Sequence, residues 1–485
     1  MLGLQPPIMM RRVTSVSLTS LLGPMVATLA IWTTGTPSLW LETDRRTEEV
    51  VAPGIRHIQV LRGSLSTTVR YRLLAGSFDS QARADAALER LEGAGFRAAP
   101  HYRNGRYRVG VEALPSREQA EAARASLEAA GFSSELTIEE YVQDVTHAGG
   151  PWEIHVLEVA PRAVRVEVAH AYDAAIGLET TSGLSRRRGA LAAVNGGYYL
   201  RTGILQGDAL GVLQVNGALL SEPDRGRAAL GILDKGGMTD LLFGRLRFRG
   251  ELVFEDGTRL ELDGINRHRA MKEILLYTPE FHRTTLTSPG GAEAVVVDNR
   301  IVEVREQSGS TVIPPSGLVV SLSPSRAIEH LSRFRVGQSL TAELSLLPAE
   351  FDADGKWKQA VSIVGGGPLL LKDGRRIEDP EVESISRVFF LSRHPRTGVG
   401  IRADGTLLFV TVDGRQPQKS VGMSLPELTD LFVELGAVSA VNLDGGGSTA
   451  MVVQGRLANS PSDPTGEREN ADAILLFSRS GTPSS

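Results

Sequence analysis

In segment 441–449, an apolar run is followed by residue types that can bind anions and sugars. Its polar and glycine members are Asn442, Asp444, Gly445, Gly446, Gly447, Ser448 and Thr449. Three consecutive glycines predict backbone that turns tightly or approaches a ligand closely. Successive exposed N–H groups can form a concave site for phosphate or another anion. A tight turn after a strand is the alternative interpretation, and the segment alone does not decide between them.

Two other apolar runs also end in glycines. The first continues as Asn195, Gly196, Gly197, Tyr198 and Tyr199, and the second as Gly365, Gly366, Gly367 and Pro368. Three loops of this design predict several strand ends that converge on one cleft. Asparagine side chains both donate and accept hydrogen bonds, which suits sugar hydroxyls and phosphate oxygens.

Cationic and acidic side chains lie close to these loops in the sequence. Arg396 and Thr397 precede a hairpin that ends at Asp413, and Arg468 precedes the final apolar run. The planar fork of arginine can make two charge-assisted bonds to a phosphodiester. A solvated surface arginine and an Asp-Gly hairpin turn are the simpler explanations for single residues of these types.

The elements that position these residues are mostly strands. Short alternating apolar runs recur from about residue 150 onward, so we predict a β-rich α+β domain over 150–479. The clearest helix begins at Ser424 with the spacing of a capping box to Glu427, and ends at Gly436. It leads into a strand over 437–443, which places Asp444 at the carboxyl end of that strand.

A smaller module precedes this domain. Two helical stretches, 86–96 and 123–132, repeat a pattern rich in alanine, leucine and glutamate that ends in Gly-Phe. A candidate strand precedes each helix, over 71–78 and 107–112. The β-α-β-β-α-β order predicts a ferredoxin-like fold for 67–142.

The motifs Ala75-Gly76-Ser77-Phe78, 94–96 and 107–110 make this module similar to a SPOR domain. The resemblance implies binding to peptidoglycan glycan strands, with Tyr71, Tyr107 and Arg108 as candidate sugar contacts. Leu74 departs from the family, which often has glutamine there. A ferredoxin-like spacer without a ligand is the alternative.

Residues 150–479 resemble the phosphodiester glycosidase family. The three glycine loops and the motif His394-Pro395-Arg396-Thr397 occur in the order seen in that family. The resemblance implies hydrolysis of the bond between an anomeric carbon and a phosphodiester oxygen. It places Asn195, Arg396, Thr397, Asp413, Asn442, Asp444, Gly445, Gly446, Ser448 and Arg468 in the site. We add Gly196, Tyr198, Asp208, Gly366, Gly447 and Thr449 as substrate contacts. The family commonly has phenylalanines where this chain has Tyr198 and Tyr199.

For the chemistry itself, we expect Arg396, Arg468 and the 445–447 amides to bind the phosphate. Asp444 is the first choice for the carboxylate that stabilises the sugar cation or activates water, ahead of Asp413 and Asp208, with Asn442 beside it. Asp208, Asp413 and Asp444 also offer oxygen ligands for Mg²⁺ or Ca²⁺. No calcium-loop or His-Glu-x-x-His motif accompanies them, so no cofactor is expected.

Composition limits the other classes. The chain of 485 residues has no cysteine, which excludes disulfides, thiolate catalysis and cysteine zinc sites. A net charge of −5 gives no sign of nucleic-acid binding. Arg11 and Arg12 precede an apolar run over 13–32, so residues 1–40 are expected to form a signal peptide or membrane anchor for export to the periplasm, envelope or exterior. Residues 41–66 resemble a linker.

Two rival functions remain at this level. A non-catalytic protein that grips an anionic wall or exopolysaccharide chain would use the same polar loops without hydrolysis. Acyl or peptide hydrolysis by Ser448 is disfavoured, because no Gly-x-Ser-x-Gly elbow surrounds that serine. We therefore expect an exported phosphodiester glycosidase that a SPOR domain targets to peptidoglycan.

Overall fold

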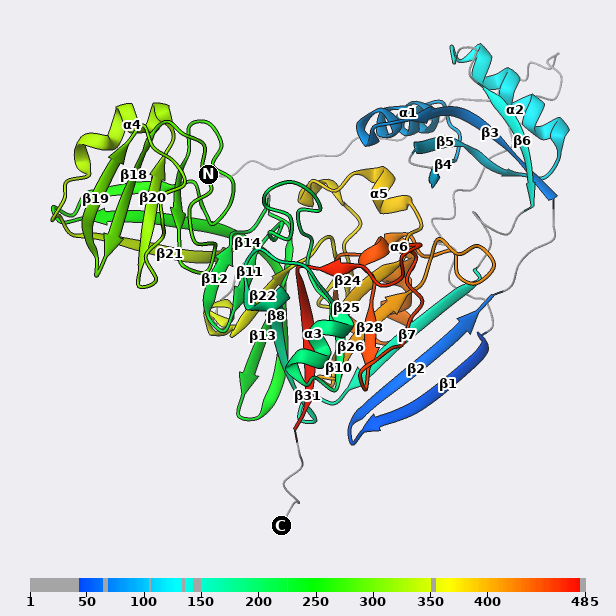
Figure 1. Cartoon of the computed structure of the whole chain (residues 1–485). Helices are drawn as coiled ribbons and strands as arrows, with labels where there is room; N and C mark the ends of the chain where they lie inside the picture. The colour runs from blue at the N-terminus through cyan, green and yellow to red at the C-terminus, as the bar shows by residue number, and fades with distance from the viewer. Residues whose placement is uncertain are drawn as a thin grey trace, which may run out of the picture. The chain divides into compact units, whose positions relative to one another are not determined.

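The structure is a computed structural model that describes residues 43–63, 69–103, 106–132, 136–142, 150–224, 226–349 and 355–479. It is an α+β protein, as predicted, in which strands far outnumber helices (Figure 1). Among the described residues, no helix has both the length and the apolar character needed to cross a membrane. The predicted signal or anchor segment over 1–40 lies outside the described residues.

The SPOR-like module has the expected β-α-β-β-α-β order, and its sheet has the strand order β4-β5-β3-β6. Its elements are β3 (Val69–Phe78), α1 (Gln81–Gly93), β4 (Ala98–Arg103), β5 (Arg106–Leu114), α2 (Arg117–Ala129) and β6 (Thr137–Val142). Ser80 and Ser116 cap the two helices by accepting hydrogen bonds from backbone N–H groups of the first turn. Leu88, Leu91 and Leu127 of the helices are fully buried against the sheet.

The large domain is organised around an eight-stranded sheet with the order β1-β2-β7-β26-β25-β27-β23-β24. Its strands are β1 (Thr43–Ala52), β2 (Ile55–Arg62), β7 (Trp152–Val159), β23 (Leu369–Lys372), β24 (Arg375–Arg376), β25 (Arg396–Arg402), β26 (Leu407–Val412) and β27 (Ala437–Asn442). Chain segments from both ends of the sequence therefore share one sheet.

The prediction of a linker over 41–66 is wrong for its described part. Residues 43–62 form the β1–β2 hairpin, and β2 pairs antiparallel with β7 along its whole length (Figure 1). Ile55, Ile58 and Val60 are buried in the large domain. The many charged residues of the hairpin hid this alternation, because an edge hairpin can leave one face in solvent. The SPOR-like module is thus inserted between two strands of the large domain's sheet.

Two further sheets pack with the first one. The five-stranded sheet has the order β29-β28-β10-β31-β8 and comprises β8 (Val164–His170), β10 (Ala192–Asn195), β28 (Met451–Val453), β29 (Arg456–Leu457) and β31 (Asp472–Ser478). The seven-stranded sheet comprises β11 (Leu213–Val215), β12 (Ala218–Ser221), β13 (Ala228–Lys235), β14 (Met238–Phe254), β15 (Arg259–Leu262), β21 (Leu340–Pro348) and β22 (Ser362–Gly365). One apolar cluster joins the three sheets through side chains that include Leu157, Val194, Leu230, Val364, Phe409, Val441 and Ile474.

Helix α6 (Leu425–Glu434) covers the other face of the eight-stranded sheet and has the predicted capping box between Ser424 and Glu427. Leu428, Leu431 and Phe432 of this helix are buried against that face. The other helices of the large domain are α3 (Thr181–Arg188), α4 (Pro324–His330) and α5 (Arg387–Leu391). A two-stranded sheet joins β9 (Glu179–Thr180) to β30 (Glu469–Asn470).

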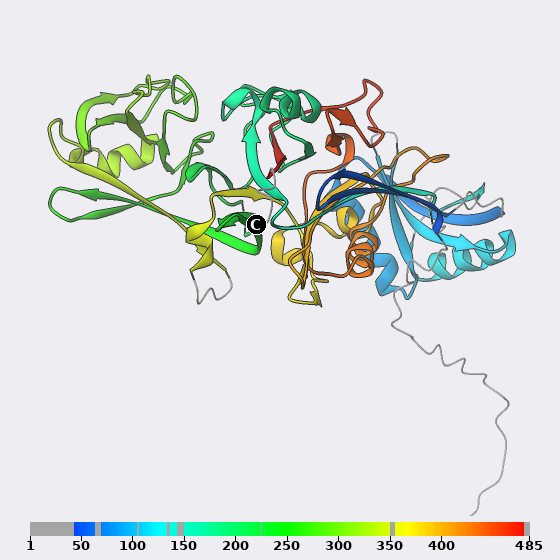
Figure 2. The same cartoon turned by 90° about the horizontal axis from the view of Figure 1, so that it is seen from below.

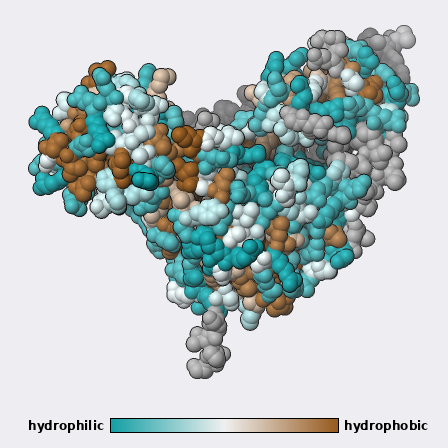
Figure 3. Space-filling view, in the orientation of Figure 1, coloured by the Kyte–Doolittle hydropathy of each residue, from teal (hydrophilic) through white to brown (hydrophobic). Residues whose placement is uncertain are grey.

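A β subdomain lies within the large domain's sequence. Its five-stranded sheet comprises β16 (Gly264–Ile265), β17 (Ile274–Tyr277), β18 (Ala292–Val297), β19 (Arg300–Glu306) and β20 (Gly317–Leu322). The long strands β14 and β21 run from the seven-stranded sheet into this subdomain (Figure 2). Figure 3 shows apolar surface on it, and Val302, Ile328 and Val336 are among its exposed apolar side chains.

Candidate active site

The side chain of Asn195 joins the ends of three strands. Its amide nitrogen donates to the backbone carbonyl oxygen of Asp444 at 2.8 Å. Its amide oxygen accepts from the hydroxyl of Thr397 at 2.7 Å and from the backbone N–H of Ala450 at 3.1 Å. Asn195, at the end of β10, and Thr397, on β25, are both fully buried. The first and third glycine loops therefore meet, as the sequence predicted.

The second glycine loop meets the same site through Asn442. The amide nitrogen of Asn442 lies 2.7 Å from the backbone oxygen of Gly367 and 2.9 Å from the hydroxyl oxygen of Tyr198. Tyr198 in turn donates to the same Gly367 oxygen at 2.9 Å. The amide oxygen of Asn442 is buried and has no hydrogen-bond partner among the described residues. That oxygen is an acceptor suited to a donor group of a ligand.

Several positions in these loops require glycine because neighbouring atoms lie where a Cβ would be, and not only because the backbone turns there. A Cβ on Gly447 would overlap the guanidinium of Arg468, and one on Gly196 would overlap the carboxylate of Asp472. A Cβ on Gly366 would lie 2.6 Å from the backbone oxygen of Asn442. Gly446 has a φ of 64°, in the left-handed region that favours glycine. Backbone and charged side chains thus pack directly on these loops.

Asp444 lies at the end of β27, at the start of the triple-glycine loop. Its Oδ1 accepts a hydrogen bond from the backbone N–H of Gly445 at 2.8 Å. Burial raises the pKa of Asp444 to about 6, against the opposing effects of hydrogen bonds from Ser448 and Gly445 and of the charges of Arg468 and Arg201. A carboxyl group with this pKa can exchange a proton near neutral pH.

Three arginines converge on the region of Asp444. Arg468 and Arg201 interact electrostatically with Asp444, and both also interact with Arg415. Arg468 donates to Asp463 at 2.7 Å and reaches the hydroxyl of Ser448 at 3.4 Å. Burial, followed by the charge of Arg468, lowers the pKa of Arg415. Cations that repel one another beside a glycine loop form a site suited to an anion.

Sequence reasoning missed Arg201 and Arg415. Arg201 follows Tyr199 by two residues, and Arg415 follows the Asp413-Gly414 pair directly, so their proximity to motif residues was the available signal. The hydrogen bond between Arg415 and Nδ1 of His394, at 3.2 Å, also joins two motif segments.

Arg396, predicted to bind the phosphate, has Nε and Nη2 of its guanidinium engaged by backbone oxygens. Its side chain is 1% exposed, and it donates to the backbone oxygens of Met423 at 2.8 Å and Ser392 at 2.8 Å. Burial lowers its pKa to about 10. Arg396 thus holds α5 and the segment before α6 in place, which makes it a structural support of the site.

Asp472 is a second carboxylate that sequence reasoning missed. It begins β31, is 2% exposed and accepts a hydrogen bond from the backbone N–H of Gly197 at 2.8 Å. Burial and, as a smaller effect, the charge of Asp444 raise its pKa to about 6, against the opposing effect of the hydrogen bond from Gly197. The asparagine-glycine turn of the first loop is therefore fixed by a carboxylate that lies 275 residues away in the sequence.

Asp208 and the hydroxyl residues have different surroundings. Burial raises the pKa of Asp208 to about 7, and its charged neighbours are Glu222 and Arg267. Ser448 and Thr449 are both buried. Ser448 hydrogen bonds to Asp444, whereas Oγ1 of Thr449 has no partner among the described residues.

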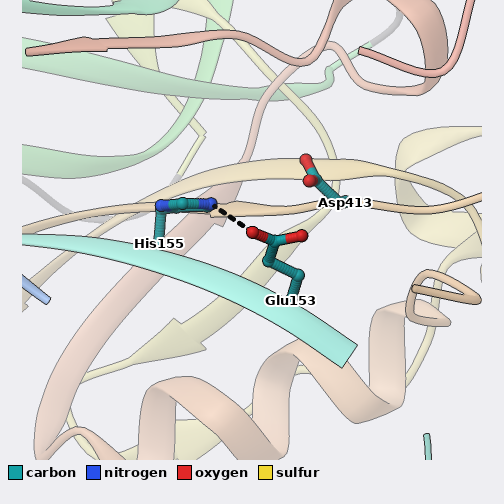
Figure 4. Close-up of side chains that lie close together, drawn as sticks. All are labelled: Glu153, His155 and Asp413. Atoms are coloured by element: carbon teal, nitrogen blue, oxygen red, sulfur yellow. Dashed lines mark ion pairs between the residues drawn. The ribbon is translucent and has the colours of Figure 1, made fainter. Parts of the chain in front are cut away.

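Asp413 lies in another polar cluster. Its side chain is fully buried, and its Oδ1 accepts hydrogen bonds from Nδ2 of Asn459 at 3.0 Å and from the backbone N–H of Ser460 at 3.1 Å. Glu153 and His155 on β7 lie beside it (Figure 4). We therefore assign Asp413 to the cluster with Glu153 and His155 rather than to the Asp444 site.

The candidate sugar contacts of the SPOR-like module divide between two faces of its sheet. Tyr107 packs against the apolar cluster on the helix side, with its ring centroid 4.8 Å from that of Tyr102. Arg108, the next residue of β5, points to the opposite face and forms an ion pair with Glu139. Tyr71 donates to Glu140 at 3.3 Å. Tyr107 and Arg108 therefore cannot contact one small ligand from the same face.

Two segments of the chain match known protein families. Residues 290–477 match the family model described as phosphodiester glycosidase, and residues 67–137 match that of the SPOR domain. The chain therefore contains a SPOR domain and a phosphodiester glycosidase domain, which confirms both predicted resemblances. Asn442, Asp444 and Arg468 lie within the matched region, whereas Asn195 and Asp208 precede it.

Individual relatives cover parts of the chain. Bovine N-acetylglucosamine-1-phosphodiester alpha-N-acetylglucosaminidase is 28% identical over 222 residues, which are 40% of this chain and 41% of that protein. An uncharacterized SPbeta prophage protein of Bacillus subtilis, YomE, is 44% identical over 84 residues, which are 17% of this chain and 13% of that protein. The chain thus matches less than half the length of both relatives.

A solved structure covers nearly the whole fold. The crystal structure of a candidate exported protein from Burkholderia pseudomallei aligns with a TM-score of 0.68 and 24% sequence identity. The alignment covers 89% of this chain and 96% of that one. At this identity, the similarity shows a common fold.

Proposed function

We propose that this protein is a phosphodiester glycosidase that hydrolyses a sugar-1-phosphodiester in a cell-envelope or extracellular glycan. The observation that carries the proposal is the convergence of Arg201, Arg415 and Arg468 on Asp444 and the triple-glycine loop. Phosphate oxygens suit the guanidinium groups, and the carboxylate suits the cationic sugar. The family match and the bovine relative support the same reaction class.

In the proposed reaction, the bond between the anomeric carbon and the phosphodiester oxygen breaks, and the oxygen of a water molecule bonds to that carbon. The products are the free sugar and a phosphomonoester. Negative charge develops on the departing phosphate, where the arginines stabilise it. Positive charge develops on the sugar ring, where ionised Asp444 stabilises it or accepts the proton of the attacking water.

The buried asparagines have positioning and recognition roles in this proposal. Asn195 fixes the backbone of Asp444 through the 2.8 Å hydrogen bond to its carbonyl oxygen. Asn442 directs its amide oxygen, which has no hydrogen-bond partner among the described residues, to a sugar hydroxyl, while its amide nitrogen is held by Gly367 and Tyr198. Fixed polar groups of this kind reduce the reorganisation required in the transition state.

The SPOR domain would place this activity on peptidoglycan, and we propose that the protein acts outside the cytoplasm. The domain match supports peptidoglycan as the partner, and the apolar run over 13–32 supports export. A pull-down with purified peptidoglycan sacculi tests the targeting. Deletion of residues 67–142 should remove the binding, and unchanged binding would contradict it.

The decisive experiment incubates the purified chain with a panel of sugar-1-phosphodiesters and purified wall polymers. Mass spectrometry should detect a free sugar and a phosphomonoester in equal amounts, and Asp444→Asn should release neither. Tight polymer binding without any released sugar would instead favour the non-catalytic glycan-binding protein.

A further inference from the structure

A buried polar cluster lies at the ends of two neighbouring strands of the eight-stranded sheet. Glu153 and His155 are two residues apart on β7, so their side chains project from the same face. Asp413 follows β26, and its backbone N–H donates to the backbone oxygen of Glu153 at 2.9 Å. One side-chain ligand atom from each residue lies within 4.8 Å of the others. Figure 4 shows the imidazole of His155 directed to the carboxylate of Glu153, with Asp413 beside them.

Burial makes this arrangement costly unless a cation balances it. The exposed fractions are 5% for Glu153, 1% for His155 and 0% for Asp413. Two carboxylates on adjacent strands repel each other, and the low dielectric of the interior strengthens that repulsion. Buried charges in proteins are therefore usually paired or bound to metals.

Two buried polar atoms, one in the cluster and one beside it, have no hydrogen-bond partner among the described residues. Nε2 of His155 has no hydrogen-bond partner among the described residues, and it lies at ion-pair distance, 3.6 Å, from Oε1 of Glu153. The hydroxyl oxygen of Thr411, the residue paired with His155 in the sheet register, is also buried without a described partner. An imidazole nitrogen held in the interior beside two carboxylates is a donor set for a metal ion.

Outer hydrogen bonds orient each of the three side chains. Nδ1 of His155 lies 3.1 Å from Nε2 of His57, so an Nδ1–H tautomer would leave the Nε2 lone pair facing the cluster. Gln59 donates to Oε1 of Glu153 at 2.6 Å. Asp413 accepts from Asn459 at 3.0 Å. Metal ligands in proteins are held by outer partners of this kind, which fix the tautomer and the direction of the lone pairs.

We propose that Glu153, His155 and Asp413 bind a divalent transition-metal ion such as Zn²⁺ or Mn²⁺. One imidazole with two carboxylates favours these ions over Mg²⁺ and Ca²⁺, which prefer all-oxygen ligands. This site differs from the all-aspartate set considered from the sequence, because Asp208 and Asp444 have other neighbours.

When no ion is bound, the ammonium of Lys419 offsets the negative charge of the two carboxylates. Its ammonium lies 2.8 Å from Oε2 of Glu153 and 3.8 Å from Oδ2 of Asp413. Its side chain is 45% exposed, so it can turn to solvent when an ion enters. Lysine and metal then compete for the same carboxylates.

The role of the ion would be to position the third glycine loop. Asn459 bonds to Asp413 and also donates to the backbone oxygen of Thr449 at 3.2 Å. It further accepts from the backbone N–H of Met451 at 2.7 Å. The ion would therefore stiffen the chain that follows the triple glycine, without contacting the substrate.

The test measures metal binding directly, so that it does not depend on the proposed hydrolysis. The full chain, free of affinity tags, is treated with chelator and then dialysed against Zn²⁺, Mn²⁺, Mg²⁺ or Ca²⁺ in separate arms. Elemental analysis should find about one equivalent of Zn²⁺ or Mn²⁺, a stoichiometry expected of a single three-ligand site. Binding of no ion, or of only Mg²⁺ or Ca²⁺, would overturn the proposal.

Variants locate the ion. His155→Gln and Asp413→Asn should each lose the bound equivalent, whereas His282→Gln, which removes an exposed histidine, should retain it. His57→Ala should weaken affinity by roughly 10- to 100-fold, as loss of an outer hydrogen bond does. Lys419→Met removes the competing ammonium and should bind the ion more tightly than the wild type. An ion that stays bound to His155→Gln would contradict the assignment. So would a lower affinity for the ion in Lys419→Met, if that variant keeps a native circular dichroism spectrum.

Discussion

The side-chain amide of Asn195 donates a hydrogen bond to the backbone carbonyl oxygen of Asp444, at 2.8 Å and across 249 residues of sequence. The same side chain accepts hydrogen bonds from Thr397 and Ala450. One buried amide thus links β10, β25 and the loop that follows β27. The position of the proposed reacting carboxylate depends on a residue that belongs to a different sheet.

Substitution of Asn195 by alanine should lower both stability and activity. The change leaves buried polar groups of Thr397, Asp444 and Ala450 without their partner, at a cost of about 1–3 kcal/mol for each unsatisfied group. Urea unfolding should therefore show a clear loss of free energy of unfolding. Asn216→Gly, on an exposed turn with a φ of 50°, is the control and should stay near wild type. Equal stability of the two variants would contradict the linking role.

Asp444→Asn should abolish release of sugar from a sugar-1-phosphodiester while the protein remains folded. The amide keeps the size of the side chain but cannot stabilise a cationic sugar or accept a proton. Product formation is measured by mass spectrometry, and folding by circular dichroism. Asp298→Asn, on an exposed turn, should behave as wild type. Turnover by Asp444→Asn within a few-fold of wild type would refute the role of Asp444.

The dependence of kcat/KM on pH should reflect the ionisation of Asp444. Burial raises the pKa of Asp444 to about 6, so kcat/KM should fall as the pH decreases below about 6 and level off above it. A limb in the opposite direction, with activity lost above pH 6, would show that the protonated acid is the active form.

The free energy of unfolding should fall as the pH rises, whereas kcat/KM should rise. Because the folded-state pKa of Asp444 exceeds its ordinary value of about 3.8, its contribution to stability is greatest below that value and is lost as the pH rises through about 6. Asp444→Asn should therefore flatten the dependence of the free energy of unfolding on pH in that window. An unchanged slope would mean that Asp444 is not protonated there.

Loss of one guanidinium should weaken catalysis without unfolding the protein. Arg468→Met removes charge beside Asp444 and Ser448, and a charge-assisted hydrogen bond contributes about 1.5–3 kcal/mol, or roughly 10- to 100-fold in kcat/KM. Arg247→Met, at an exposed position of β14, serves as the control. A change in kcat/KM no larger than that of the control would contradict the role of Arg468 in phosphate binding.

Gly447→Ala tests whether close packing on the glycine loop matters. Its Cβ would overlap the guanidinium of Arg468 and the carboxylate of Asp463, so the arginine must move. Activity should fall in the same direction as for Arg468→Met. Gly93→Ala introduces a Cβ with no atom within 4 Å and should leave the kinetics unchanged. Full activity in Gly447→Ala would show that the position of Arg468 is not critical.

Local patterns determined much of this protein. The capping box at Ser424 and Glu427 and the repeated helices of the SPOR domain depend on residues within a few positions of one another, and both predictions are confirmed. The three glycine loops also stood out from the sequence, because glycine after an apolar run signals close approach wherever it occurs.

Tertiary structure decided what those loops contact. Arg201, Arg415 and Asp472 join the region of Asp444 from distant segments, and no local pattern marks an arginine or aspartate that packs on a remote loop. The β1–β2 hairpin was hidden for the same reason, because its pairing partner β7 follows the whole SPOR domain. Residue types and spacing determined which chemistry is possible, whereas non-local pairing and burial decided which side chains share a site and how their pKa values shift.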